Sequence, residues 1–573
     1  MSWKNDIRVV VGIDFGTTYS GFAYSHLLDE NENVHINDQW HGIMGKFKTN
    51  TTLQYDDELK NVVLWGNPAL CKKPNRKKNN NEKKPVELFK LHLGNCLNKP
   101  ELTVPYKKAI TDYLDELGKL IEETVTKKWT SIDFMKNVLL VVTVPAEYSE
   151  NDKLTMRECI FNAGLIENLS SEKLQFTTEP EAAAIYCMNN CLMEHNLTAP
   201  GTIFMIADCG GGTVDLTTRK LLGENQLGEV TERAGDFCGS TFIDKEFVNL
   251  LKREVGSSAV TLFEKNHYGQ MQYLIQDFCR RAKLLFSDDN PDFIYELDLE
   301  ELAPSLKQYV TGKEKNSLEK INWFIEIDFE SMKSMFDPIV NRIVEMIDTQ
   351  LNNSSGKCSA IFLVGGFSQS NYLQKAIKDK FSHKVENISV PTQPIAAVVY
   401  GAALYGRSLN EVEDLTDLSN SKRIIVTRVL NRTFGVLVSP KWNLGDPPER
   451  ITIGGRIDKF CLLAKRGTEV TINEKFTETM VPVFSFQTNI CFEIYYTTKS
   501  EAVYCDEPGM KLLGKLLIEL PDVELGTYRP VTFNLSFGAI EVKASAYNKT
   551  NGQNYESVFQ LNERFSDPLD DNE

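Results

Sequence analysis

The chain has 573 residues, more than one hydrophobic core usually supports, so we expect two or more domains. Hydrophobic residues make up 42% and charged residues 25%, which is typical of a soluble globular protein. The 79 acidic residues outnumber the 63 basic ones, and the formal net charge of −16 repels nucleic acid and acidic membrane surfaces. The charge therefore disfavours a general polyanion binder.

The first residues carry no signal-peptide pattern, and no apolar run is long enough to span a bilayer. We therefore expect a cytoplasmic protein, or one shared with the nucleus, that does not cross a membrane. The 12 cysteines have no paired CxxC spacing and are interpreted as small core residues in a reducing compartment.

Residues 7 to about 405 alternate between apolar runs and amphipathic helical stretches, which is typical of an α/β fold. The first run, "VVVGIDFGTTYSG" (9–21), is an apolar strand that ends at Asp14 and turns through Gly16, Thr17 and Thr18. Glycine lets phosphate oxygens approach the backbone, hydroxyls donate to them, and a carboxylate holds Mg²⁺ through its waters. A plain hairpin turn fits this motif equally well.

A second stretch, "ADCGGGTVD" (207–215), repeats the scheme. Its three glycines, Gly210 to Gly212, weaken a strand unless another group approaches their backbone closely. Asp208 and Asp215 flank them, which is costly for like charges unless a cation or solvent reaches both. The two loops together favour a phosphate site between two similar halves, although the repeat is short.

Two further motifs follow the same α/β pattern. "TTEPEAAAIY" (177–186) predicts a helix start, because Pro180 suits a first turn and alanines favour the body. Glu179 fits either a carboxylate favoured by the helix dipole or one that orients an attacking water. "LVGGFSQS" (363–370) predicts a strand, two glycines and a helix start, where Gly365 and Gly366 allow a base or ribose to lie against the backbone.

The pattern changes after residue 406. Residues 407–423 are polar and acidic and show no hydrophobic periodicity of a helix or a strand, which predicts a linker. Residues 424–562 alternate, as in "VTFNLSF" (531–537), and predict an all-β domain. Residues 563–573 are predicted to be an acidic, disordered tail, and the Lys- and Asn-rich stretch 72–85 a solvated loop rather than a basic docking site.

Seven motifs in this order resemble the seventy-kilodalton heat-shock chaperone family, which has the two-lobed actin/hexokinase ATPase fold. They are "GIDFGTTYS", "VVTVPAEYS", "TTEPEAAAI", "ADCGGGTVD", "AGDFCGSTF", "LVGGFSQS" and "VVYGAALYG", which together cover residues 8 to 405. "LLAKRGTEV" and "LLGKLLIELPD" resemble the substrate-binding β-sandwich of that family more loosely. The resemblance points to a divergent branch without the C-terminal helical lid.

The resemblance implies that ATP or ADP binds with Mg²⁺ between the two lobes of residues 1–406. Residues implied to act in catalysis are Asp14, Lys90 (in "ELFKLHLG"), Glu179 and Asp208. Those implied to act on Mg²⁺ are Asp14, Asp208 and Asp215. Those implied to hold phosphates are Gly16, Thr17, Thr18, Tyr19, Gly210, Gly211, Gly212 and Thr213. Those implied to line the nucleoside pocket are Gly239, Lys283, Gly365 and Gly366.

The chain also departs from the family. Arg280 stands where the family has Glu, Leu284 where it has an Arg that stacks on the base, and Ile395 where it has an acid. The base pocket is therefore altered, and adenine preference is less firmly implied than phosphate binding. The acidic segment replaces the family's hydrophobic linker, and the chain ends without lid helices or an acidic docking tetrapeptide.

The sequence is compatible with three functions. The first is a chaperone-type ATPase whose lid-less β-sandwich binds unfolded polypeptide or protein clients with co-chaperones. The second is a nucleotide-gated scaffold or sensor with negligible turnover. Asp14, Glu179 and Asp208 argue against it, whereas the altered linker and base pocket argue for it. The third, a sugar or metabolite kinase, is disfavoured by the β domain.

Overall fold

The structure is a computed structural model that describes residues 3–29, 33–70, 84–94, 99–146, 148–223, 226–410, 424–471, 474–537 and 542–559. The chain divides into two compact units. The first comprises Met1–Glu147, Thr155–Asn225 and Arg233–Ile424, and the second Tyr148–Leu154, Gln226–Glu232 and Ile425–Glu573. Nearly all of the predicted loop 72–85, most of the linker 407–423 and the tail 563–573 lie outside the described residues. None of the described helices is long and apolar enough to cross a membrane.

The first sheet of the first unit begins with the opening motif. Its strand order is β11 (Leu174–Thr178), β10 (Val138–Val144), β1 (Val9–Phe15), β2 (Tyr19–His26) and β3 (His35–Ile36), with β6 (Thr49–Asn50) beside β2. Strands β1 and β10 are parallel and buried along their whole length, as their continuous apolar runs predict. Strand β2 returns antiparallel to β1, so the Gly/Thr turn closes a hairpin.

A second sheet repeats this arrangement. In this unit its strands follow the order β13 (Val214–Gly223), β12 (Ile203–Cys209), β18 (Cys358–Val364) and β19 (Asn387–Ser389), with β15 (Ala234–Asp236) beside β13. Strand β12 is antiparallel to β13 and parallel to β18, just as β1 is antiparallel to β2 and parallel to β10. The short sequence repeat therefore corresponds to a structural one.

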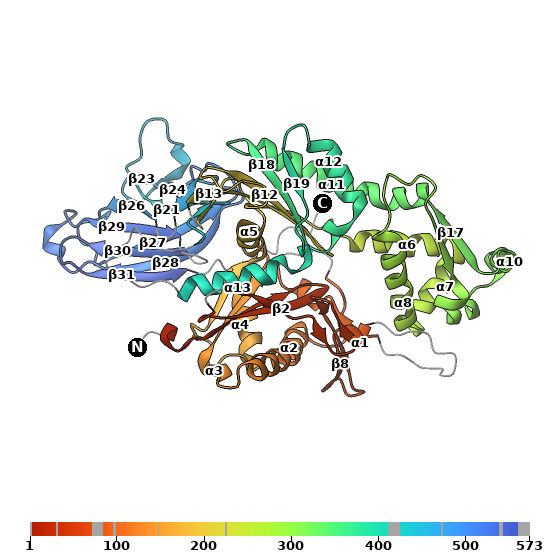
Figure 1. Ribbon diagram of the computed structural model, residues 1–573. Helices are drawn as coiled ribbons and strands as arrows, with labels where there is room; N and C mark the ends of the chain where they lie inside the picture. Colours follow the sequence, from red (N-terminus) through yellow and green to blue (C-terminus); the bar gives the residue numbers. More distant parts are fainter. Residues whose placement is uncertain are drawn as a thin grey trace. The chain divides into compact units, whose positions relative to one another are not determined.

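Two helices, α5 (Glu179–Asn190) and α13 (Ala397–Asn410), pack against each other among the strands of these sheets (Figure 1). Helix α13 contacts β1, β2 and β10, and α5 contacts β11 and β12. Small residues allow this approach: a Cβ on Gly401 would lie 1.7 Å from the carbonyl oxygen of Ala182, and one on Gly12 would lie 2.6 Å from the amide nitrogen of Ala403. The α5–α13 contact thus depends on glycine at position 401.

The other helices lie around this framework. Helix α2 (Tyr106–Lys128) buries the predicted periodic residues Ile110, Leu114, Leu117, Ile121 and Val125. Helices α11 (Phe329–Asn352) and α12 (Asn371–Phe381) share one hydrophobic cluster with α6 (Thr241–Val255), α7 (Ser257–Asn266) and α8 (Tyr268–Phe278). The antiparallel strand pair β16 (Ile294–Asp298) and β17 (Phe324–Asp328) joins the same cluster.

Further helices and strands complete the two units. The further helices are α1 (Asn67–Leu70), α3 (Phe134–Asn137), α4 (Glu150–Asn162), α9 (Leu299–Leu302) and α10 (Gly312–Lys320). A π-helical turn spans Cys279–Lys283. The further strands are β4 (Gln39–Trp40), β5 (Ile43–Met44), β7 (Thr52–Tyr55), β8 (Val62–Trp65), β9 (Val86–Glu87), β14 (Gln226–Glu229), β20 (Thr427–Val429), β22 (Ile451–Thr452), β23 (Arg456–Ile457) and β25 (Glu469–Thr471). The 3₁₀ helices are η1 (Trp3–Asp6), η2 (Phe89–His92), η4 (Pro304–Gln308), η5 (Phe367–Gln369), η6 (Pro394–Ala396), η7 (Pro448–Arg450) and η8 (Val523–Leu525).

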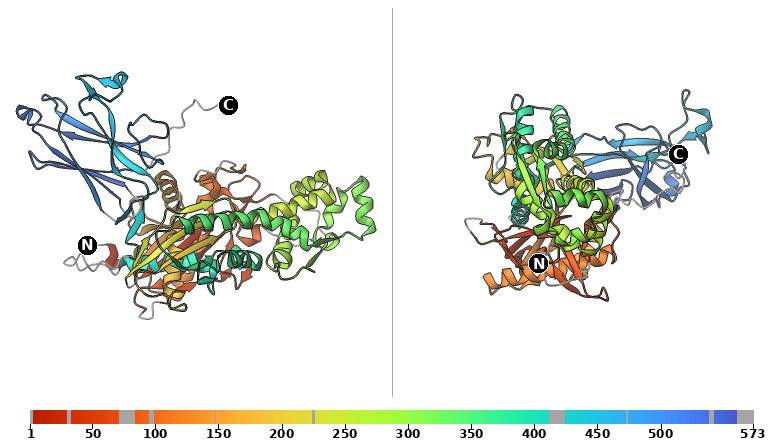
Figure 2. Two further views of the ribbon diagram at one scale, coloured as in Figure 1. Left: turned by 90° about the horizontal axis from the view of Figure 1, so that it is seen from above. Right: turned by 90° about the vertical axis from the view of Figure 1, so that its right-hand side faces the viewer.

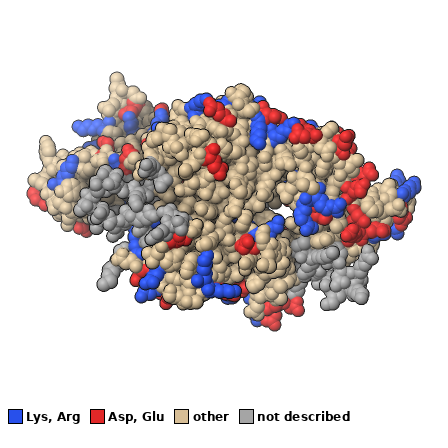
Figure 3. Space-filling view, in the orientation of Figure 1, with Lys and Arg blue, Asp and Glu red and all other residues tan. Residues whose placement is uncertain are grey.

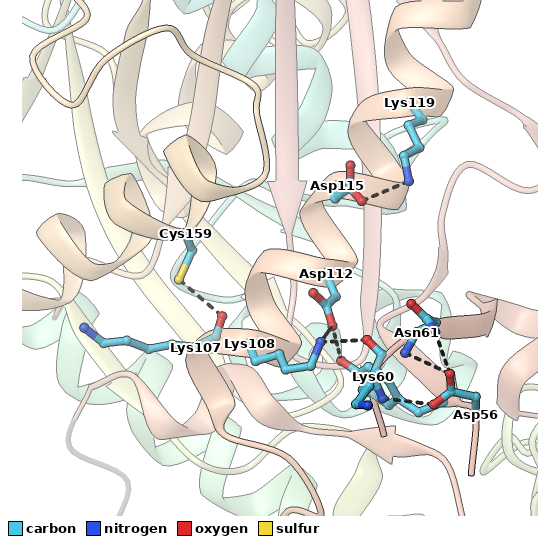
Figure 4. A network of polar contacts seen from close by, with 10 residues as sticks. Asp56, Lys60, Asn61, Lys107, Lys108, Asp112, Asp115, Lys119 and Cys159 are labelled. Carbon is cyan, nitrogen blue, oxygen red and sulfur yellow. Dashed lines mark hydrogen bonds and ion pairs between the residues drawn. The ribbon is translucent and has the colours of Figure 1, made fainter. Parts of the chain in front are cut away.

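A polar network fastens the β7–β8 hairpin to helix α2 (Figure 4). The Lys108 ammonium donates to Asp112 Oδ2 at 2.6 Å and to the carbonyl oxygen of Lys60 at 3.1 Å. The Tyr55 hydroxyl donates to the same carboxylate oxygen at 2.8 Å. Burial of the hydroxyl, and to a lesser extent the Asp112 carboxylate, raises the pKa of Tyr55. The Asp56 carboxylate accepts from the Lys60 amide at 2.9 Å, which stabilises the turn of the hairpin.

The second unit contains two four-stranded antiparallel sheets (Figure 2). One has the order β24 (Lys459–Ala464), β21 (Thr433–Val438), β27 (Asn489–Thr497) and β28 (Lys511–Glu519). The other has the order β26 (Lys475–Met480), β29 (Val531–Phe537), β30 (Val542–Asn548) and β31 (Asn554–Phe559). Strand β29 buries every second residue, as its alternation predicts. Both sheets contribute to one core, in which the rings of Phe492 and Phe533 lie 4.8 Å apart.

A contact between β9 and α8 carries a titratable group. The Tyr268 hydroxyl donates to Glu87 Oε1, and the Lys84 ammonium lies 5.1 Å from the centre of the Tyr268 ring. Burial raises the pKa of Glu87 to about 7, Lys84 lowers it and Glu264 raises it further. Glu87 therefore holds a proton in the folded protein at pH values where a free glutamate is ionised.

We expect Gly401→Ala to lower the free energy of unfolding by about 2 kcal/mol, because the new methyl would collide with the backbone of α5. Chemical denaturation measures the change. Gly366→Ala is the matched control, since a Cβ there meets nothing within 4 Å. Equal stability of the Gly401→Ala and Gly366→Ala proteins would contradict the dependence on close packing.

Glu87→Gln is expected to reduce the loss of stability with rising pH. Between the ordinary value of 4.5 and about 7, the unfolded chain loses a proton that the folded protein keeps, so stability falls across this window. Relative to the parent, the variant should gain about 2 kcal/mol between pH 5 and pH 8. Denaturation curves at both pH values test this, with the exposed Glu58→Gln as control. A parent and variant that change in parallel would disprove it.

Candidate functional site

The first loop is a tight turn that only glycine allows. A Cβ on Gly16 would lie 2.2 Å from the carbonyl oxygen of Tyr19. The Gly16 amide donates to Ser20 Oγ at 3.2 Å, and Thr51 Oγ1 donates to the Gly16 carbonyl at 2.8 Å. The hydroxyls of Ser20 and Thr51 are themselves hydrogen-bonded at 2.8 Å. The turn after Asp14 is thereby fixed from both sides.

The second loop, 210–213, is closed by a hydrogen bond of 3.0 Å from the Gly210 amide to the Thr213 carbonyl. Its carbonyls are held by the segment that follows β15. The Gly239 amide donates to the Gly212 carbonyl at 3.1 Å. The amides of Ser240 and Thr241 donate to the carbonyls of Gly210 and Gly211 at 3.1 Å and 2.9 Å, respectively. A Cβ on Gly239 would lie 2.4 Å from the Gly211 carbonyl oxygen, so this predicted site glycine is required for the loop packing.

The two loops come together as the sequence predicts. A Cβ on Gly211 would lie 2.7 Å from Thr18 Oγ1, which places the second loop directly against the first. A Cβ on Gly365, whose φ is +84°, would lie 2.4 Å from Asp208 Oδ1. The ends of β1, β12 and β18 therefore meet at one place.

Charged side chains from both halves gather here. The Lys48 ammonium donates to Asp14 Oδ2 at 2.5 Å, and the Lys90 ammonium donates to Glu179 Oε1 at 2.8 Å. Lys90 is 4% exposed, so it is not a surface lysine. Burial raises the pKa of Asp208 to about 7; Glu179 and Asp14 raise it further, whereas Lys48 lowers it. Burial by itself lowers the pKa of Lys48, but the nearby carboxylates together raise it by more, so the net shift is upward.

Asp215 lies directly opposite Asp208 in the β12–β13 ladder, so both side chains share one face of the sheet. Asp215 is 8% exposed, and a Cβ on Gly235 would lie 2.7 Å from its Oδ1. Strand β15 thus packs closely against this carboxylate, beside the second loop.

The position of Glu179 is set by the start of helix α5. Thr178 is the N-cap, its hydroxyl accepts from the Glu181 amide at 3.3 Å, and the Glu181 carboxylate accepts from the Thr178 amide at 3.3 Å. Arg233 donates to Glu181 Oε1 at 2.9 Å and to Thr178 Oγ1 at 3.3 Å. Glu179, the first helical residue, is therefore held by a capping box and a buried ion pair.

The predicted nucleoside residues lie next to the loops. The Lys283 ammonium donates to the Ser240 carbonyl at 2.7 Å and to Asp244 Oδ1 at 2.6 Å. Tyr19 is 41% exposed, and it interacts electrostatically with Cys279, Asp244 and Lys283 of this region. Tyr19 of the first loop thus lies close to the π-helical turn. Gly366 is the N-cap of η5 with a φ of −68°, and a Cβ there would meet nothing within 4 Å.

The residues present fit a Mg²⁺ ion that keeps most of its waters. No group of three or more His, Cys, Asp or Glu side chains with metal-binding spacing occurs among the described residues. Asp14, Asp208 and Asp215 therefore do not form a closed set of direct ligands. Mg²⁺ commonly uses one or two carboxylates and substrate phosphates, and the raised pKa of Asp208 reflects burial and negative charge that a cation would neutralise.

Sequence reasoning missed two site residues, Lys48 and Arg233. Neither belongs to a glycine-rich loop or an apolar run, and "GKFKTN" (45–50) has no period that marks Lys48. The sequence offered no usable signal for Arg233 either. Both reach the site through strand register and loop packing, which a single sequence does not reveal.

Arg233→Ala is expected to lower the free energy of unfolding by about 3 kcal/mol, because it removes the guanidinium that pairs with the buried Glu181 carboxylate. Urea denaturation measures this loss. Arg342→Ala is the matched control, since that arginine is 55% exposed and its ion pair with Asp236 should contribute no more than about 1 kcal/mol. Similar losses in the two variants would contradict a special role for Arg233.

Comparisons with known proteins identify the family to which this chain belongs. The Hsp70 protein family model matches residues 113–422. Heat shock 70 kDa protein 12A of Mus musculus is 25% identical over 637 residues, covering 96% of this chain and 91% of that protein. Heat shock 70 kDa protein 12B of Homo sapiens is 24% identical, covering 94% and 89%. The chaperone protein DnaK of Picrophilus torridus is 28% identical over 280 residues, covering 48% and 40%. The resemblance indicated by the seven motifs is confirmed: the chain belongs to the Hsp70 family.

Proposed function

We propose that the protein is a divergent chaperone-type ATPase. Residues 1–406 form an actin-like nucleotide-binding domain that binds Mg·ATP and hydrolyses it to ADP and phosphate between two lobes. The observation that carries the proposal is the meeting of the two glycine loops around Asp14, Glu179 and Asp208. Membership of the Hsp70 family supports nucleotide binding at these residues.

Phosphoryl transfer to water needs positioning and charge stabilisation more than covalent chemistry. The backbone of 210–213 and the hydroxyls of Thr17 and Thr18 would bind phosphate oxygens. Asp14, Asp208 and Asp215 would hold Mg²⁺ through its waters, and the ion would neutralise phosphate charge. Glu179 would accept a hydrogen bond from the attacking water, while Lys90 and the capping box keep its carboxylate in place.

Asp208 suits the role of proton acceptor. Burial and the neighbouring Glu179 and Asp14 raise its pKa, so its carboxylate would accept a proton from the attacking water, and a nearby cation would favour the release of that proton afterwards. It lies among the same charges as Glu179, so both carboxylates face one reaction site. The nucleoside would rest against Gly239, Lys283, Gly365 and Gly366.

We propose that residues 424–562 form a β-sandwich that binds unfolded polypeptide or specific protein clients, assisted by co-chaperones. The two sheets share one core, and exposed apolar side chains lie in the segment 439–456, which contains the short strand β22, and in the loop 481–488. Leu444 is 98%, Ile453 87% and Phe486 72% exposed. Buried Arg529 donates to the carbonyls of Ser485 and Gln487, so the loop 481–488 has a fixed frame.

The surface charge does not favour nucleic acid as a partner. On the face shown in Figure 3, basic and acidic side chains lie in small mixed groups, and the chain carries a net charge of −16. We propose a cytoplasmic protein.

A second candidate is a nucleotide-gated scaffold or sensor with negligible turnover. The altered base pocket favours it. Leu284 is 37% exposed and has no planar guanidinium to stack on a base, and the exposed Arg280 donates to the Gln276 carbonyl. In this alternative, ATP would shift the populations of two conformations without being consumed.

Single-turnover hydrolysis of Mg·ATP by the full chain tests the proposal. We expect Glu179→Ala to lower the rate about 100-fold or more while ATP binding persists, because the water loses its acceptor. Glu58→Ala, a change at an exposed carboxylate, should hydrolyse ATP at the parental rate.

The two candidates predict different results. Binding with equally negligible turnover in the parent and in Glu179→Ala would refute the ATPase and leave the scaffold. No ATP binding by the parent would refute both.

A further inference from the structure

The lysine that contacts Asp14 is placed by the opening motif itself. Asp14 on β1 pairs with Gly21 on β2, and Lys48 directly precedes β6, which pairs with the start of β2. A Cβ on Gly21 would lie 2.7 Å from the Phe47 carbonyl oxygen and 3.0 Å from Lys48 Cγ. Glycine at position 21 therefore lets the Lys48 stem pass directly over β2 toward Asp14.

The side chain of Lys48 is constrained near its backbone, whereas its terminal bonds can rotate. Its side chain is 16% exposed, and its inner carbons lie against β2. The bonds beyond Cγ are those that a lysine can turn at little cost, so the ammonium can move while the stem stays in place. The Asp14 carboxylate holds that ammonium at 2.5 Å in the structure.

When a nucleotide binds, its phosphates offer the Lys48 ammonium a second partner. Lys90 is bound to Glu179 at 2.8 Å, so the two lysines hold different carboxylates. A divalent cation that approaches Asp14 competes with the Lys48 ammonium, and the phosphates that accompany the cation offer oxygen atoms in exchange. Ammonium groups bind phosphate as point charges and need no particular fork geometry.

We propose that Lys48 is a phosphate-binding residue that exchanges its ion pair with Asp14 for the terminal phosphates of a nucleoside triphosphate. This inference rests on the proposed nucleotide function and adds a residue to that site. The Lys48 ammonium neutralises the Asp14 carboxylate before the nucleotide binds, and it neutralises the terminal phosphates once the nucleotide is bound. The site thus keeps a buried positive charge in both states.

Metal-free ATP binding separates phosphate contact from simple neutralisation of Asp14. The titration is done by calorimetry on the full chain in EDTA, with Asp14→Asn as the reference protein. In this background Lys48 has no carboxylate at position 14 to neutralise and is available to phosphate. We expect Asp14→Asn/Lys48→Met to bind ATP about tenfold to 100-fold more weakly than Asp14→Asn.

The matched control is Asp14→Asn/Lys46→Met, which removes the same charge from an exposed lysine two residues away. Its affinity should stay within about twofold of the reference. Asp14→Asn/Lys48→Arg should restore most of the affinity, since arginine also binds phosphate. If the Asp14→Asn/Lys48→Met protein does not fold, as judged by thermal unfolding, Asp14→Asn/Lys48→Gln takes its place in the same comparison.

Equal ATP affinity with and without Lys48 in the Asp14→Asn background would overturn the inference, and so would the absence of metal-free binding by Asp14→Asn. Either result leaves the proposed function standing if the parent binds Mg·ATP. Failure of the parent to bind Mg·ATP would instead refute the proposed function.

Discussion

Two lysine ammonium groups lie among three carboxylates, and the candidate site depends on this balance of charge. Asp14, Glu179 and Asp208 come from separate strands and a helix, and burying them together would be strongly unfavourable without Lys48 and Lys90. The remaining excess of negative charge contributes to the raised pKa of Asp208. A metal ion with phosphates fits such a site, because it adds charges of both signs.

The glycines allow the backbone segments around this charge cluster to approach one another closely. Gly16 closes the first loop, Gly211 lets the second loop reach Thr18, and Gly365 lets the end of β18 reach Asp208. Each contact is shorter than a side chain would allow. The site is therefore specified by residues with no side chain as much as by those that carry charge.

Much of the fold could be predicted from the sequence. Continuous apolar runs identified the buried parallel strands β1 and β10, the 3.6-residue period identified α2, and strict alternation identified β29. The paired loops were predictable too, because three successive glycines between two aspartates are costly in an ordinary strand. The family resemblance added Lys90, whose burial beside Glu179 no local pattern indicates.

Lys48 and Arg233 show where prediction from one sequence stops. Lys48 reaches Asp14 only because Gly21 leaves room above β2, and Arg233 reaches Glu181 across a sequence separation of 52 residues. Such contacts depend on the register between elements and produce no periodic pattern in the sequence. The roles of the predicted nucleotide residues stay predictions, since contacts within the protein do not identify a ligand.

The packing of α13 has a consequence for biosynthesis. This helix, at the C-terminal end of the first unit, covers β1 at its N-terminal end, and Arg407 donates to Ser25 Oγ at 2.9 Å and to the His26 carbonyl at 2.8 Å. The strand that carries Asp14 therefore leaves the ribosome long before its covering helix is made. Its apolar face must stay shielded from aggregation during that interval, so a member of a chaperone family would itself depend on protection while it is being synthesised.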